Sequence, residues 1–435
     1  MIAKVRESSL NGELKIPGSK SHMIRALFFA ALGRGTSTIR EPVFSKDALS
    51  ALGIIRALGI EVDDSREDRW IVDGGRLQPA DDVLNVGNSG TTMNLGSALL
   101  ASLDAWSVVT GDEQIRRRPA QPVLEALCQL GAESFTVRDN GSAPFLIRGP
   151  LIGGHGRVDG LISQYASSAL IAASLARTDT EIEVVRPNEV PYLEMTLSWM
   201  RSLGLEVQAS EKMDHFWVKS GQEYQSFDLA VPGDFSSAAF FLVGAAITES
   251  RLLLRGLRSD DVQGDKVLID ILREMGADIE VKDLGERGIE VRGGAPLKGI
   301  TIDCGDTPDS VPILSVLGCY AAGETRLKNI ASSRQKETDR PLLMERELKK
   351  MGARIRLEDD ELVISNSRLY GSEVDSHRDH RIAMALCVAG MIAQGVTTVA
   401  GVESATVSYP GFDRSLTHVG AEVEFIPDIP DTLEQ

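Results

Sequence analysis

The chain has 435 residues, of which 43% are hydrophobic and 25% charged, so it can bury large cores and is expected to form more than one domain. A formal net charge of −17 argues against a nucleic-acid partner, which would require a basic face. No apolar run is long enough to span a bilayer, which predicts a cytoplasmic protein without a membrane partner. Widely spaced cysteines predict buried free thiols rather than disulfides or metal ligands: Cys128, Cys304, Cys319 and Cys387.

The first informative segment is a Pro-Gly turn at residues 17–18, followed by a predicted helix. Ser19 or Ser21 can cap this helix, which leaves first-turn N–H groups able to face an anion. Lys20 and Arg25 add positive charge to the same segment. The pattern predicts a phosphate or carboxylate site, and the plainer alternative is a capped surface helix.

One sequence pattern recurs six times along the chain: a predicted helix end, then a glycine, then a short predicted strand. The intervals between its glycines are 72, 73, 72, 76 and 68 residues, a period that suits a βαβαββ-sized unit. Each glycine is predicted to adopt the left-handed conformation just beyond a helix end. Helix–glycine–strand connections are common in α/β proteins, but the regular spacing favours true repetition. The glycines are Gly59, Gly131, Gly204, Gly276, Gly352 and Gly420.

Six such units divide naturally into two α/β domains of three units each. A second Pro-Gly turn, at residues 232–233, leads like the first into a helix rich in serine and alanine. The chain is therefore expected to cross between domains at both turns, near residues 17–19 and 230–234. The first domain is predicted to span 17–231 and the second 1–16 plus 232–435.

Three polar segments follow in the first domain. Residues 88–92 begin a helix with small residues, which let backbone N–H groups approach a ligand or serve only as a cap. Arg118 ends a basic run before Pro119, which is predicted to start a helix and fix the arginine; the alternative is a solvated run. Residues 162–165 begin another helix with hydrogen-bonding side chains.

In the second domain, Lys336, Glu337 and Arg340 are predicted to share a helical face. A carboxylate held between two cations suits proton transfer, because it can be oriented and tuned. The alternative is an ordinary ladder of surface ion pairs.

Two further segments of the second domain carry candidate residues. Asp309 is either a helix N-cap or a base that faces a cleft. His380 and Arg381 favour an anion site over a metal, because no third ligand has a suitable spacing. The chain lacks a Walker loop, a dinucleotide fingerprint and a nucleophile elbow. We therefore expect a cleft between domains that binds two small polyanions and transfers protons without a metal or cofactor.

These motifs resemble, in order and over nearly the whole chain, the EPSP synthase family of 3-phosphoshikimate 1-carboxyvinyltransferases. The resemblance implies two inside-out α/β domains, each of three βαβαββ units, with the active site in the cleft between them. It also implies transfer of the enolpyruvyl group of phosphoenolpyruvate to the 5-hydroxyl of shikimate 3-phosphate, with glyphosate as a competitor of phosphoenolpyruvate. The motifs are Pro17–Ser21 with Arg25, Gly87–Met93, Arg118-Pro119, Ser163-Gln164, Lys336–Arg340 and Asp379–Arg381.

The resemblance also implies a role for each matching residue, in an expected monomer that binds small anionic substrates. Asp309 would take the proton of the attacking hydroxyl, and Glu337 would protonate the methylene carbon with help from Lys20. The residues implied for shikimate 3-phosphate are Ser21, Arg25, Ser163, Tyr192 and Lys336. Those implied for phosphoenolpyruvate are Lys20, Asn88, Gly90, Thr91, Arg118, Gln164, Arg340 and Arg381.

Four positions depart from the family pattern. Asn94 stands where arginine is usual, and Val407 where some members have lysine. Ile162 and Glu189 each stand where the family usually has a serine, both on the acceptor side. We therefore expect shikimate 3-phosphate to bind more weakly than is usual, with Glu189 turned to solvent or paired with a cation.

Two alternatives stay open. One is an enolpyruvyl transferase of the same fold that acts on another phosphorylated or nucleotide-sugar acceptor. Residues 111–118 lack the reactive cysteine that the enzyme acting on UDP-N-acetylglucosamine usually has. The other alternative is a non-catalytic binder of phosphorylated metabolites, which would be expected to lose Asp309 or Glu337.

Overall fold

The chain forms two compact units. The computed structural model describes residues 1–282 and 288–427. The first unit comprises Gly18–Pro232 with Val262–Gly264. The second unit comprises Met1–Pro17, Gly233–Asp261 and Asp265–Gln435. The chain thus leaves one unit for the other at each of the two Pro-Gly turns.

One repeat of the first unit shows the plan that the others follow. A strand, a helix and a parallel strand are followed by a second helix and an antiparallel pair of strands, which gives the sheet order β6-β7-β9-β8. Its elements are β6 (Leu84–Asn85), α3 (Gly90–Ala101), β7 (Ser107–Thr110), α4 (Gln121–Gln129), β8 (Glu133–Thr136) and β9 (Phe145–Arg148). This is the βαβαββ unit that the glycine spacing predicts.

The other two repeats of the first unit use the same order of strands. One contains β10 (Gly154–Asp159), α5 (Ser163–Leu175), β11 (Thr180–Val185), α6 (Val190–Ser202), β12 (Val207–Ala209) and β13 (His215–Val218). The other contains α1 (Lys20–Leu32), β3 (Gly33–Arg40), α2 (Lys46–Ala57), β4 (Glu61–Asp63) and β5 (Arg69–Gly74). Its leading parallel strand comes from later in the chain, as β14 (Tyr224–Gln225) and β15 (Asp228–Ala230).

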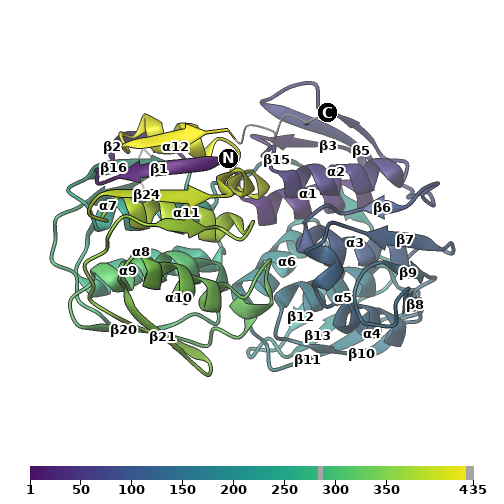
Figure 1. Ribbon diagram of the computed structural model, residues 1–435. Helices are drawn as coiled ribbons and strands as arrows, with labels where there is room; N and C mark the ends of the chain where they lie inside the picture. The colour runs from purple at the N-terminus through teal and green to yellow at the C-terminus, as the bar shows by residue number, and fades with distance from the viewer. Residues whose placement is uncertain (283–287, 428–435) are drawn as a thin grey trace, which may run out of the picture. The chain divides into compact units, whose positions relative to one another are not determined.

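The second unit repeats the plan three times and takes two strands from the N-terminus. Figure 1 shows purple β1 beside yellow β24, in agreement with their antiparallel pairing. Its first two repeats contain β2 (Asn11–Lys15), α7 (Phe235–Ala246), β16 (Arg251–Arg255), α8 (Leu268–Met275), β17 (Asp278–Lys282), β18 (Gly288–Arg292), β19 (Thr301–Asp303), α9 (Val311–Tyr320), β20 (Glu324–Lys328), α10 (Arg340–Lys350), β21 (Arg354–Glu358) and β22 (Glu361–Ser365). The last contains β23 (Glu373–Asp375), α11 (His380–Gly390), β24 (Val396–Ala400), α12 (Phe412–His418), β25 (Val423–Ile426) and β1 (Ile2–Arg6).

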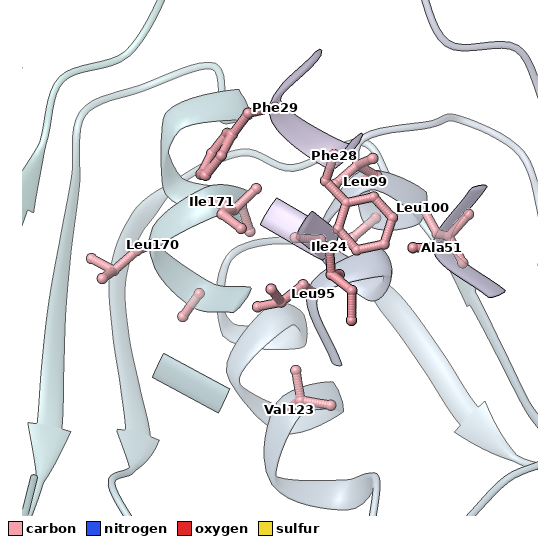
Figure 2. Close-up of a cluster of buried hydrophobic side chains, with 14 of the residues drawn as sticks. Ile24, Phe28, Phe29, Ala51, Leu95, Leu99, Leu100, Val123, Leu170 and Ile171 are labelled. Atoms are coloured by element: carbon pink, nitrogen blue, oxygen red, sulfur yellow. The ribbon is translucent and has the colours of Figure 1, made fainter. Parts of the chain in front are cut away.

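The first helix of each repeat lies inside its unit, because most of its residues are apolar or small. Every residue of α3 and of α7 is buried. Figure 2 shows the core of the first unit, where Phe28 from α1, Leu99 from α3 and Ile171 from α5 belong to one hydrophobic cluster. These inner helices therefore bring polar residues at their N-termini to fixed places within each unit.

The prediction for the six repeat glycines is confirmed. Each follows the end of a helix and has a positive φ, between +81° and +108°. A side chain is unfavourable in this conformation, so glycine is the residue that ends these helices most readily. None of the helices in the described part of the chain combines the length and apolar character needed to cross a bilayer.

Candidate active site

Many of the predicted site residues of the first unit lie at the N-termini of its inner helices. Lys20 is the first residue of α1, Gly90 the first of α3 and Ser163 the first of α5. Ser19 occupies the N-cap position of α1, but its side chain makes no capping hydrogen bond. Ser89 caps α3 by accepting a hydrogen bond from the Thr92 N–H. These ends can offer N–H groups to an anion.

An amide network joins the starts of α3 and α5. Gln164 Nε2 donates to Thr91 Oγ1 at 3.0 Å, and Asn94 Nδ2 donates to Gln164 Oε1 at 2.8 Å. Asn94 is buried, and its Oδ1 accepts no hydrogen bond from the described residues. Asn94, which stands where the family usually has arginine, therefore holds the side chain of Gln164 in place through a neutral amide.

Arg118 lies beside the first turn of α3. Its Nη2 lies 3.4 Å from Asn88 Oδ1, and a Cβ built at Gly90 would lie 2.6 Å from its Nη1. The absence of a side chain at Gly90 thus leaves room for the guanidinium. The predicted helix start at Pro119 was wrong: α4 begins at Gln121, because Pro119 forms an isolated bridge with Ser142.

Arg25 is buried within the first unit rather than exposed on a helix face. Its Nε donates to Thr196 Oγ1 at 3.0 Å, and its two terminal nitrogens donate to the carbonyls of Ser21 and Tyr192 at 3.1 and 3.2 Å. Burial lowers the pKa of Arg25 to about 10. Arg25 therefore fixes Ser21 and Tyr192, two other residues implied for the acceptor.

Lys20 forms an ion pair with Asp47, with Nζ 3.1 Å from Oδ2 and both side chains almost buried. Asp47 lies in the first turn of α2, where a carboxylate is favoured by the helix dipole. The pair holds the lysine ammonium at the start of α1.

One of the two outcomes expected for Glu189, a side chain turned to solvent, was wrong. Glu189 is buried, with 1% of its surface exposed. Its Oε2 accepts hydrogen bonds from the Ser163 N–H at 3.0 Å and from Ser163 Oγ at 2.7 Å. Ile162 occupies the N-cap position of α5, but its hydrocarbon side chain cannot accept a capping hydrogen bond. Glu189, the residue just before α6, therefore caps α5, and the two acceptor-side departures form one arrangement.

The second unit holds two arginines and several carboxylates in one buried cluster. Arg340 donates to Asp309 Oδ1 at 2.7 Å, to Asp379 Oδ2 at 2.9 Å and to Glu337 Oε2. Arg381 donates to Asp309 Oδ2 at 2.9 Å. Asp309 is thus held by a guanidinium on each oxygen, while its side chain keeps 20% exposure.

The charges of this cluster keep its arginines protonated. Burial alone would lower the pKa of Arg340, but Asp379, Glu337 and Asp309 outweigh it and raise that pKa above its ordinary value. Burial also opposes the charged form of Arg381, yet nearby Asp309 holds its pKa above the ordinary value. Both arginines of this cluster therefore stay protonated, and their charges are matched by the carboxylates that they bind.

Asp265 supports this cluster and was missed by sequence reasoning. It is 1% exposed, and its Oδ1 accepts hydrogen bonds from Thr307 Oγ1 at 2.5 Å and Ser310 Oγ at 2.6 Å. Thr307 precedes the short 3-10 turn Pro308–Ser310 and Ser310 ends it, so the two hydroxyls lie on either side of Asp309. Burial, and then the charge of Asp309, raise the pKa of Asp265. Asp265 lies more than forty positions before this turn, so no local pattern reveals it.

The predicted helical face at Lys336, Glu337 and Arg340 was wrong, because α10 begins only at Arg340. Asp339 caps that helix by accepting from the Leu342 N–H, so Lys336 and Glu337 lie in the segment before it. The contact between Glu337 and Arg340 is nevertheless present.

Three possible metal-ligand atoms, from Glu337, Asp379 and His380, lie within 4.8 Å of one another. Both carboxylates already bind the guanidinium of Arg340. Its permanent positive charge would repel a divalent cation, so this donor set does not suit a metal.

The fold and these clusters define an α/β protein whose helix N-termini and arginines suit small anionic ligands. A family model described as EPSP synthase (3-phosphoshikimate 1-carboxyvinyltransferase) matches residues 5–416. The chain belongs to the EPSP synthase family. The resemblance and fold class predicted from the sequence are thereby confirmed.

Relatives of the chain agree with this assignment over almost their full length. The 3-phosphoshikimate 1-carboxyvinyltransferase of Acetivibrio thermocellus is 45% identical, over 97% of this chain and 99% of that protein. The protein of the same name from Methanocaldococcus jannaschii is 37% identical, over 95% and 97%.

Solved structures show the same fold. The EPSP synthase of Acinetobacter baumannii aligns with a TM-score of 0.83 at 30% identity, covering 97% of this chain and 99% of that one. The enolpyruvyl transferase NikO of Streptomyces tendae aligns with a TM-score of 0.78 at 17% identity, covering 97% and 98%, and shares the fold.

Proposed function

We propose that this chain transfers the enolpyruvyl group of phosphoenolpyruvate to the 5-hydroxyl of shikimate 3-phosphate and releases phosphate. The observation that carries the proposal is the shared guanidinium of Arg340, which binds both Asp309 and Glu337. The reaction needs a base for the attacking hydroxyl, an acid for the methylene carbon and cations for two anionic substrates. This cluster supplies all three kinds of group.

In the proposed mechanism, Asp309 takes the hydroxyl proton as the acceptor oxygen attacks the central carbon of phosphoenolpyruvate. Glu337 gives a proton to the methylene carbon, which becomes a methyl group, and Lys20 assists. Glu337 then removes a methyl proton, the double bond re-forms, and phosphate leaves with the proton that Asp309 had taken, so both carboxyl groups return to their starting states. Proton transfer by a positioned group contributes about 10²–10⁴-fold to such a rate.

The binding roles are proposed from the family pattern. Phosphoenolpyruvate is assigned to Lys20, Asn88, Gly90, Thr91, Arg118, Gln164, Arg340 and Arg381, and shikimate 3-phosphate to Ser21, Arg25, Ser163, Tyr192 and Lys336. Because Arg340 and Arg381 already hold Asp309, an anionic substrate that binds them competes with this carboxylate. Substrate binding would therefore weaken the contacts of Asp309 and make it a stronger base.

The proposal is tested by phosphate release from phosphoenolpyruvate, measured with and without shikimate 3-phosphate. We expect release only with the acceptor. Turnover with a different phosphorylated alcohol, and none with shikimate 3-phosphate, would replace this proposal by a transferase with another acceptor.

We further propose that the protein is a cytoplasmic monomer. Its four cysteines are free, which suits a reducing compartment. Light scattering during size-exclusion chromatography tests the oligomeric state, and a mass well above 47.0 kDa would contradict the monomer.

A further inference from the structure

The contact between Glu189 and Ser163 determines what Ser163 can offer a ligand. Ser163 is the first residue of α5, and Glu189 is the residue just before α6. Their side chains form a hydrogen bond although 26 positions separate them in the sequence. Glu189 adopts the left-handed conformation, with φ of +52°, which is uncommon for a residue with a side chain. Such a conformation persists where surrounding contacts fix it, and it places this carboxylate on α5.

The direction of the hydrogen bonds follows from their chemistry. A backbone N–H can only donate, so the Glu189 Oε2 that lies 3.0 Å from the Ser163 nitrogen is an acceptor. The same oxygen lies 2.7 Å from Ser163 Oγ, so the hydroxyl proton points to it. A serine hydroxyl has one proton, and Ser163 therefore keeps only lone pairs for any other partner.

We propose that Glu189 is a specificity-determining residue, which makes Ser163 a hydrogen-bond acceptor and selects a hydroxyl group of the acceptor substrate, rather than its phosphate, at this position. The inference rests on the proposed function in one respect, namely that Ser163 contacts the acceptor. A phosphate dianion has no proton to donate, whereas a ring hydroxyl does.

Asn94 resembles Ser163 in having a side-chain oxygen that can accept a hydrogen bond. Asn94 donates through Nδ2 to Gln164, the residue after Ser163, and its buried Oδ1 accepts no hydrogen bond from the described residues. Ser163 and Asn94 thus both present oxygen lone pairs. An anion would find no donor on the Ser163 hydroxyl, whereas a hydroxyl of a polyhydroxylated ring would find an acceptor there.

The test distinguishes the direction of the Ser163 hydroxyl proton from the effect of the negative charge on Glu189. Glu189→Gly suits the left-handed backbone and removes the acceptor, which frees the Ser163 hydroxyl and N–H. Glu189→Gln removes the charge but keeps a carbonyl oxygen that can accept both bonds. Titration of inorganic phosphate by calorimetry should show about a ten- to hundredfold gain in affinity for the glycine variant. The glutamine variant should gain less than about fivefold, the effect of a charge alone.

Two further variants locate the effect. Glu189→Gly combined with Ser163→Ala should return phosphate affinity to the wild-type value, since the gain depends on the freed hydroxyl. Glu194→Gln removes an exposed carboxylate from the same helix and should leave the affinity unchanged. Equal gains in the two Glu189 variants, or a gain that persists without Ser163, would overturn the inference.

A milder variant covers the case in which Glu189→Gly does not fold. Ser163→Ala alone should weaken binding of shikimate 3-phosphate about two- to tenfold and leave inorganic phosphate binding unchanged. Equal weakening of both ligands would mean that Ser163 donates to phosphate and would refute the proposal. The phosphate titrations need no turnover, so they remain decisive even if the proposed reaction fails.

Discussion

Alanine at position 90 tests whether the start of α3 holds Arg118 in a working position. A Cβ at Gly90 would lie 2.6 Å from Arg118 Nη1 and 3.7 Å from Gln164 Oε1. Ordinary contact begins near 3.4 Å, so the guanidinium must move by about 0.8 Å while Gln164 can stay. Misplacing a positioning group by about 1 Å can cost up to about 10²-fold in rate. We expect Gly90→Ala to raise the KM for phosphoenolpyruvate about tenfold and to weaken glyphosate more than the substrate.

The assay is steady-state phosphate release with phosphoenolpyruvate and glyphosate varied in turn. Gly96→Ala is the matched control, because a Cβ on this residue of the same helix would meet Phe28 at an ordinary 3.6 Å. Its kinetic constants should stay at wild-type values, and both variants should unfold at or above the wild-type temperature, since alanine favours a helix. Unchanged constants for Gly90→Ala, or equal losses for substrate and inhibitor, would refute the reasoning.

Three other predictions concern the second unit. Glu337→Gln should lower kcat about 10²–10⁴-fold with little change in substrate binding by equilibrium dialysis; near-normal turnover would remove Glu337 from the mechanism. Asp265→Asn weakens the support of the turn that carries Asp309, so kcat should fall about tenfold with an unchanged circular dichroism spectrum, and full activity would contradict this role. Hydrogen bonds from Lys282 and Arg251 lower the pKa of Glu290 from 4.5 to about 2. Its charge therefore stabilises the fold above pH 4.5, and this contribution is lost as the pH falls toward 2; Glu290→Gln should flatten that part of a urea-unfolding profile, and an unchanged slope would contradict the assignment.

The repeats were predictable because their signal is local. A glycine such as Gly204 ends its helix through its own backbone conformation, and its spacing to the next glycine reports the length of one structural unit. The start of α10 was harder to place. The spacing of Glu337 and Arg340 fits a helix, but the Asp339 cap and Pro341 begin the helix after Glu337.

Long-range partners could not be predicted from patterns in one sequence. In the sequence, Ile162 and Glu189 are two separate losses of a hydroxyl. In the structure they belong together, because Ile162 is an apolar N-cap of α5 and the carboxylate of Glu189, just before α6, does the capping. Asp265 was missed for the same reason, because its role depends on a turn brought near it only by folding. Ser236, which binds Arg381, had a usable signal, since it follows the second Pro-Gly turn as Ser21 follows the first.

Strands β1 and β2 pair with strands that follow much later in the chain, and this imposes an order on folding during synthesis. The segment Gly18–Pro232 contains every strand of the first unit's sheets, so that unit can assemble its sheets while the rest of the chain is still being made. Strand β1 is translated first, yet its partners β24 and β25 emerge almost 400 residues later. At about 5–20 residues per second, this strand waits about 20–80 s with its backbone unpaired by its native neighbours. Strand β1 therefore needs protection from mispairing during that interval, and its alternating charged residues Lys4 and Arg6 discourage edge-to-edge association.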